Sequence, residues 1–245
     1  MDSKFEMPTE TVDLPTKGLL YPEDSPLAAG TIEMKYMTAK EEDILTNTNY
    51  IKNGTVIDKL LKALIVTENV DYNALLTGDK NAIMIAARIL AYGKNYEVDY
   101  NGETHTVDLT QLKEKEVDYS LFQNRTNSFE FKLPNSDNKI TFKLLSHEDE
   151  RKIEEEQKGL KKINKDSSTE VTTRLKHMIT GINGVTEKKD IRNFVDNYLL
   201  SKDARELRKF YTSISPDIEL KFSTTDGEED VDLPIGLTFF WPDSN

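Results

Sequence analysis

The hydrophobic pattern of this 245-residue chain is strongest along residues 78–109. Apolar side chains occupy most positions between Lys80 and Tyr92, and they leave almost no polar face. A helix of this kind packs against other elements on every side. We expect it to have Asp79 as its N-cap and to end at Gly93, which can adopt the positive φ of a helix terminus.

Two runs of alternating apolar and polar residues follow this helix. They are separated by Asn101-Gly102, and both residues of that pair readily adopt positive φ. This pattern predicts a β-hairpin with a tight turn directly after the buried helix.

The same order of elements is predicted twice along the chain. Residues 31–112 read as a strand, a capped helix, a longer helix, the buried helix and the hairpin. Residues 139–245 repeat this order in a more polar form, with Asp226-Gly227 at the second hairpin turn. We interpret the recurrence as an internal duplication. Identity between the copies is low, so two unrelated α+β segments of similar pattern are the alternative.

The predicted fold class is therefore α+β, with two tandem degenerate repeats. An extended N-terminal arm (residues 1–30), rich in proline and glycine, precedes the first repeat, and a connector (residues 113–138) joins the two repeats. The charged stretch 154–170 predicts either a solvated extension of a helix or a mobile loop. The closing segment 233–242 reads as an apolar strand.

Composition narrows the classes of partner. The net charge is −12, which disfavours a nucleic-acid backbone or an anionic membrane. The chain has no cysteine, which excludes disulfides, thiolate nucleophiles and Cys-ligated metals. Its longest wholly apolar run, residues 82–87, is too short to span a bilayer, and no secretion signal is apparent. We therefore expect a soluble protein of the cytoplasm.

No residue stands out as catalytic, cofactor-binding or metal-binding. The three histidines, His105, His147 and His177, lack metal-ligand spacing, and we expect the first two at the surface. Clustered acids after Thr38 and Ser146 are typical of helix starts. A hydrolase that uses carboxylates alone leaves no local signal and is the less favoured alternative.

Arg88 is the unusual residue of the buried helix, because it lies in an otherwise apolar stretch. A buried guanidinium requires a carboxylate or carbonyl partner. We expect a structural ion pair rather than a ligand site.

Several segments resemble the baseplate hub assembly proteins of contractile-tailed phages. The central run GDKNAIMIAARILAYGKNYEV, followed by a hairpin and VDL, matches that family's pattern of an acid, an arginine and Tyr-Gly-x-x-Tyr. The opening DLPTKGLLYP and the closing PIGLTFFWP also resemble the family's terminal signatures. Some relatives carry Cys-x-x-Cys pairs on the hairpins that could hold zinc, and this chain differs from them in having no cysteine.

The resemblance implies a non-enzymatic morphogenesis protein that binds other tail or hub subunits while the baseplate hub assembles in the host cytoplasm. A structural hub subunit retained in the virion tail is the alternative, and a homo-oligomer is compatible with either role. The terminal segments carry large apolar side chains of the type that dominate protein interfaces. The candidate partner-binding residues are Leu19, Leu20, Tyr21, Phe240 and Trp241, and the alternative is that these side chains complete the core of the chain itself.

Overall fold

A computed structural model describes residues 7–122, 124–163, 169–223 and 230–241 of the chain. Mixed α and β structure is confirmed, and the sheets are small, with two or three strands each. The α-helices are α1 (Ala39–Leu45), α2 (Thr48–Lys52), α3 (Val56–Leu64), α4 (Thr77–Tyr92), α5 (His147–Ile163), α6 (Glu170–Met178), α7 (Lys188–Asn197) and α8 (Ser201–Ile214). The strands are β1 (Thr9–Asp13), β2 (Thr31–Lys35), β3 (Asn95–Tyr100), β4 (Glu103–Asp108), β5 (Phe129–Lys132), β6 (Lys139–Phe142), β7 (Ile179–Ile182), β8 (Lys221–Ser223) and β9 (Asp230–Asp232).

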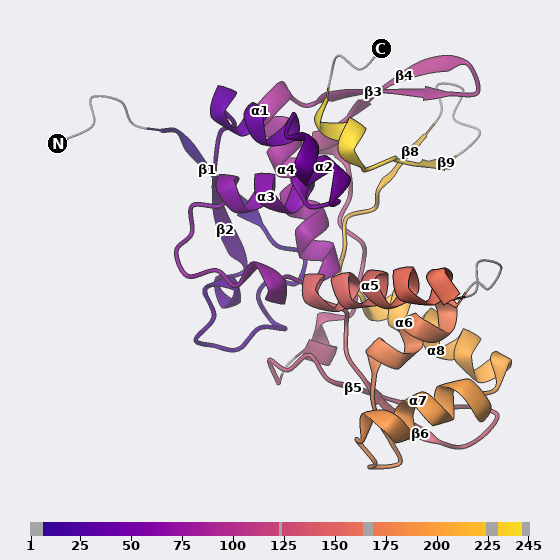
Figure 1. Cartoon of the computed structure of the whole chain (residues 1–245). Helices are drawn as coiled ribbons and strands as arrows, with labels where there is room; N and C mark the ends of the chain where they lie inside the picture. The colour runs from indigo at the N-terminus through magenta and orange to yellow at the C-terminus, as the bar shows by residue number, and fades with distance from the viewer. Residues whose placement is uncertain (1–6, 123, 164–168, 224–229, 242–245) are drawn as a thin grey trace.

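Helix α4 runs through the middle of the first half and leads into the β3–β4 hairpin (Figure 1). It ends at Gly93, whose φ of 86° bears out the predicted terminus. Its start differs from the prediction, because Leu76 occupies the N-cap position and Asp79 lies inside the first turn. Asp79 is therefore not the cap. Its carboxylate instead accepts hydrogen bonds from the N-terminal segment.

The N-terminal segment joins the first sheet. Strand β1 pairs antiparallel with β2, and Met34 of β2 also bridges to Ile65 after α3. After β1 the chain buries Leu14, Leu20 and Tyr21 before it returns as β2. The segment thus contributes to the core that it shares with residues 31–112.

The second half carries a three-stranded sheet, with β6 between β5 and β7. The helix expected after Ser146 is confirmed as α5, and strand β5 lies within residues 113–138, the stretch predicted as a connector. Helix α5 continues to Ile163, so the charged stretch begins as an extension of the helix, whereas residues 164–168 lie outside the described part of the chain. Helices α2 and α7 and strand β7 were not predicted.

The β3–β4 hairpin and the β8–β9 hairpin lie at the same end of the molecule (Figure 1). The β3–β4 pairing is confirmed, and Asn101 and Gly102 have φ values of 52° and 85° at its turn. Strands β8 and β9 pair as the second hairpin prediction requires. The Asp226-Gly227 turn itself falls outside the described residues.

The prediction of a closing strand is wrong. Residues Leu237–Phe240 form a short 3-10 helix instead. Phe239 and Phe240 are adjacent and both fully buried, whereas neighbouring side chains of a strand would point to opposite faces. The 3-10 turn lets both rings enter the core, where Phe239 meets Tyr96 at 4.8 Å between ring centroids.

Candidate protein-binding surfaces

Asp79 fastens the N-terminal segment to α4. Its fully buried carboxylate accepts hydrogen bonds from the Thr16 backbone N–H at 3.0 Å, the Thr16 hydroxyl at 2.7 Å and the Tyr21 hydroxyl at 2.5 Å. The Tyr21 oxygen in turn accepts the Leu76 N–H at 3.0 Å. Burial raises the pKa of Asp79 to about 6, and the neighbouring Asp217 adds to the rise. This anchor turns Tyr21 inward.

Asp203 makes a comparable contact in the second half. It is the third residue of α8, as Asp79 is of α4, and it is also fully buried. One carboxylate oxygen accepts the Asn135 backbone N–H at 2.9 Å and the Asn135 side-chain amide at 2.7 Å. Burial alone would raise the pKa of Asp203, but the polar groups of Asn135 and Ser136 together outweigh it and lower the pKa.

The two halves meet at a polar junction around Asp58. Its carboxylate accepts hydrogen bonds from Tyr72 and Lys80 at 2.8 Å each and lies 3.3 Å from Nε2 of His147. The Lys80 ammonium also lies 3.0 Å from Nδ1 of His147. Backbone hydrogen bonds from His147 N to Leu75 O and from residue 77 to residue 145 complete the join.

The predicted surface positions of two histidines are wrong. His147 is buried at this junction, against the Tyr72 ring at 4.8 Å between centroids. His105 is buried in the hairpin region, 5.7 Å from the Phe222 ring. Residues distant in the sequence shield both side chains from solvent. The local sequence pattern around each histidine therefore does not predict its burial.

Arg88 is buried, as expected, but the expected ion pair is not among the contacts of the described residues. Its guanidinium lies over the rings of Tyr92 and Tyr96, at 4.9 and 5.6 Å from their centroids. It also donates a long hydrogen bond of 3.4 Å to the Gly93 carbonyl. The electron-rich faces of the two tyrosine rings therefore contact the Arg88 guanidinium in place of the predicted carboxylate.

Three of the five candidate partner-binding residues are buried in the core: Leu20, Tyr21 and Phe240. Leu19 and Trp241 are half-buried and pack against the core. A large apolar side chain in a terminal segment gave no information on whether the segment folds back. Partner binding by Leu19 and Trp241 stays a prediction.

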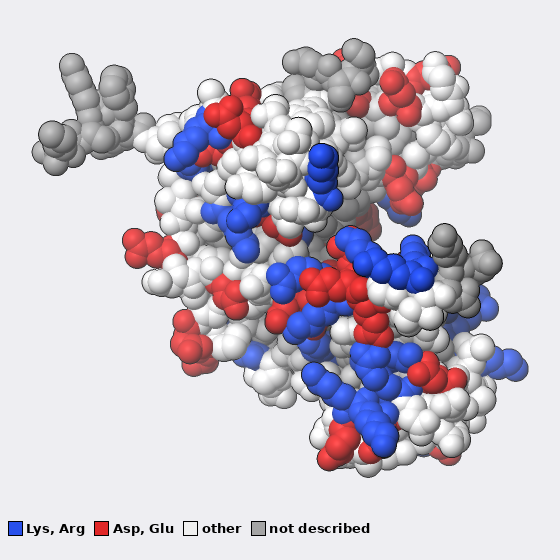
Figure 2. Space-filling model, in the orientation of Figure 1, with Lys and Arg blue, Asp and Glu red and all other residues white. Residues whose placement is uncertain are grey.

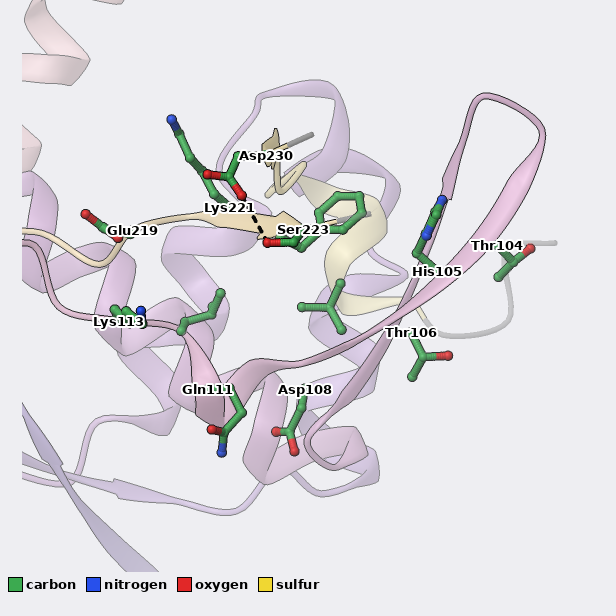
Figure 3. A pocket seen from close by; sticks show the side chains of 13 residues that line it. Thr104, His105, Thr106, Asp108, Gln111, Lys113, Glu219, Lys221, Ser223 and Asp230 are labelled. Carbon is green, nitrogen blue, oxygen red and sulfur yellow. Dashed lines mark hydrogen bonds between the residues drawn. The ribbon is translucent and has the colours of Figure 1, made fainter. Parts of the chain in front are cut away.

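A groove separates the two hairpins (Figure 3). It has a volume of about 630 Å³ and lies between β4 and β8. Consecutive residues of each strand line it, and Val107, Leu112 and Phe222 provide its apolar surface. Lys113, Glu219 and Lys221 contribute charges of both signs at one end. Local sequence pattern does not reveal this groove, although the alternation around Asn101-Gly102 indicates which β4 residues face outward.

Charges of both signs are also interleaved on the face formed by α5 and its neighbours (Figure 2). Arg174 pairs with Glu150, and Arg192 pairs with Glu156. A protein that binds a nucleic-acid backbone presents a continuous basic surface. The mixed charges of this face do not form one.

Neither a metal-binding cluster nor a membrane-spanning helix occurs among the described residues. In that part of the chain, no cluster of three or more His, Asp or Glu side chains could hold a metal ion. Within the same ranges, no helix is long and apolar enough to cross a membrane.

A known protein family matches most of this chain. Neither the curated proteins nor the solved structures that were compared gave a match to this chain. A family model described as "T4 bacteriophage base plate protein" matches residues 7–241, a range that contains all four sheets of the described part of the chain and the closing 3-10 helix. The chain therefore belongs to the T4 bacteriophage base plate protein family.

Proposed function

We propose that this chain is a non-enzymatic morphogenesis protein that binds hub or tail subunits during assembly of the baseplate hub. The family match over residues 7–241 is the observation that carries the proposal. The proposed site of action is the host cytoplasm. A structural subunit retained in the virion tail is the second candidate.

We also propose that residues 31–112 and 139–245 are two copies of one duplicated unit, and that each copy also includes the strand that precedes it, β1 or β5. Each half begins with a hairpin, β1–β2 or β5–β6, and a further segment pairs with its second strand. Helices α3 and α6 have nine residues each, and each is followed directly by that pairing segment. The buried carboxylates of Asp79 and Asp203 also hold the connection between the hairpin strands of their own half.

The helix starts add support to the duplication. Glu41 accepts the Thr38 N–H at 3.0 Å and a hydrogen bond from Lys35 at 2.8 Å. Asp149 accepts the Ser146 N–H at 3.1 Å and hydrogen bonds from Lys143 at 2.7 Å. Lysine, hydroxyl and acid thus share one spacing in both halves.

The test is a pull-down of the tagged full-length chain from infected cells, with mass spectrometry of the proteins that co-purify. The proposal predicts that tail and hub proteins of the phage are enriched over a tag-only control. Recovery of host proteins alone would contradict a role in tail assembly.

A further inference from the structure

The backbone of β4 has one edge that is unpaired within the described part of the chain. The turn at Asn101-Gly102 makes Tyr100 and Glu103 the first hydrogen-bonded pair of the hairpin. Hydrogen-bonded pairs then alternate with non-hydrogen-bonded pairs along the ladder. The backbone groups of Thr104 and Thr106 therefore point away from β3, and no other described residue makes a backbone hydrogen bond to them.

Strand β8 presents a similar edge across the groove. The Leu233 N–H bonds to the Leu220 carbonyl, which fixes the alternation in the β8–β9 pair. Counting from that bond, the backbone groups of Ser223 point away from β9. Thr104, Thr106 and Ser223 all line the groove (Figure 3).

The groove is closed at one end by a short antiparallel pairing. Lys115 N donates to the Asp217 carbonyl at 2.8 Å, and Glu219 N donates to the Lys113 carbonyl at 2.7 Å. The two strands separate beyond this join, and the buried rings of His105 and Phe222 meet between them. A strand edge on each side of an apolar floor is suited to an extended polypeptide, which can extend the ladder with its own backbone.

We infer that the groove between β4 and β8 binds an extended segment of a partner tail protein, which adds a strand at the β4 edge through Thr104 and Thr106. This inference rests on the proposed function, since it names the surface through which a tail subunit would be held. An apolar side chain of the segment would cover Val107 and Leu112, both of which line the groove.

The charges of the groove favour a polypeptide as its occupant. The lining contains the lysines Lys113 and Lys221 and the acids Glu219 and Asp230, as well as Asp108, which already pairs with Lys94. A phosphate backbone would meet these acids unfavourably, whereas a segment with side chains of both signs can pair with each group. A second copy of this chain carries a net charge of −12 and is therefore the less suitable partner.

The experiment uses the full-length chain and overlapping short peptides that tile the tail proteins of the same phage. Thr106→Pro removes the outward N–H of β4, and Thr106→Ala changes the same side chain but keeps that N–H. Glu97→Pro is the matched control for strain, because Glu97 lies opposite Thr106 and its N–H points away from β4 on the far edge of the hairpin. Thermal melts and amide exchange at His105 and Val107 establish that the hairpin of each variant is intact.

The expected result is a peptide that binds wild type, Thr106→Ala and Glu97→Pro alike, with affinity at least about tenfold weaker for Thr106→Pro. Equal binding by all four proteins would overturn the inference. Whole tail proteins that bind when no peptide does would also overturn it, while the proposed function would stand.

Two further outcomes are decisive. If no tail protein or peptide binds the chain at all, the proposed function fails together with the inference. Self-association that is abolished by Thr106→Pro alone would assign the groove to a second copy and would overturn the choice of partner.

Discussion

The hydroxyl of Tyr21 donates a hydrogen bond of 2.5 Å to the buried carboxylate of Asp79, 58 residues along the chain. Through this contact and the two from Thr16, the N-terminal segment is fixed to the start of α4. Tyr21, a candidate partner-binding residue in the sequence, thus helps to hold the first half together.

Replacing Tyr21 with phenylalanine should destabilise the fold. The change removes one donor to Asp79 and leaves the Leu76 N–H, which Tyr21 accepts, unpaired in the core. We expect a loss of about 1–3 kcal/mol in the free energy of unfolding, measured by denaturant titration. Tyr36→Phe is the matched control, because its hydroxyl bonds to Glu10 at an exposed site. Equal losses for both variants would contradict the anchoring role of Tyr21.

The raised pKa of Asp79 predicts a specific dependence of stability on pH. Its value is about 6 in the folded chain, against 3.8 for an unperturbed aspartate, so the folded state holds this proton more tightly than the unfolded state. The contribution of Asp79 to stability is therefore greatest below pH 4 and declines as the pH rises towards 6. The difference in unfolding free energy between wild type and Asp79→Asn should fall by up to about 3 kcal/mol over this range.

Asp217→Asn provides the control for the pH experiment, because the charge of Asp217 contributes to the raised pKa of Asp79. In that background the decline between pH 4 and 6 should be smaller. A difference between wild type and Asp79→Asn that stays constant or increases with pH would contradict the assignment.

Equivalent caps in the two halves should have equivalent effects on stability. Thr38→Ala and Ser146→Ala each remove a hydroxyl that bonds to a buried acid, Glu41 or Asp149. Each should cost about 1 kcal/mol, and the two losses should add in the double variant. Thr46→Ala, at the exposed end of α1, is the control and should change stability by less than about 0.5 kcal/mol. A large effect in one half only would argue against duplicated roles.

Trp241 is the better of the two remaining terminal candidates for contact with a partner. Trp241→Ala should weaken association with a tail protein by about 2 kcal/mol or more if the ring is an interface anchor. Tyr198→Ala removes a more exposed ring and serves as the comparison. Unfolding of the Trp241 variant without a selective loss of binding would show that the ring serves only the core.

Local signals predicted several elements correctly. The Asn101-Gly102 turn places two positive φ values between alternating runs, and the Thr38 and Glu41 pair marks a helix start by its spacing alone. The turn and the helix start each depend on a few consecutive residues. Their structure can therefore be predicted without knowing which other segments pack against them.

Contacts between distant residues account for the errors. Asp79 has the residue type of an N-cap, but its role is set by Thr16 and Tyr21, which are 63 and 58 residues away. His147 is buried because α5 begins against Tyr72 and Asp58 of the first half. The groove likewise forms only where two hairpins from different halves meet, so its lining could not be assembled from local pattern.

The most direct test of the proposed role is the ratio of this chain to hub subunits in purified virions, measured by quantitative mass spectrometry with isotope-labelled standards. An assembly protein should be abundant in infected cells during tail formation and absent from finished particles, or present far below the hub subunits. A stoichiometric ratio in purified virions would contradict the assembly role and identify the chain as a structural component of the baseplate.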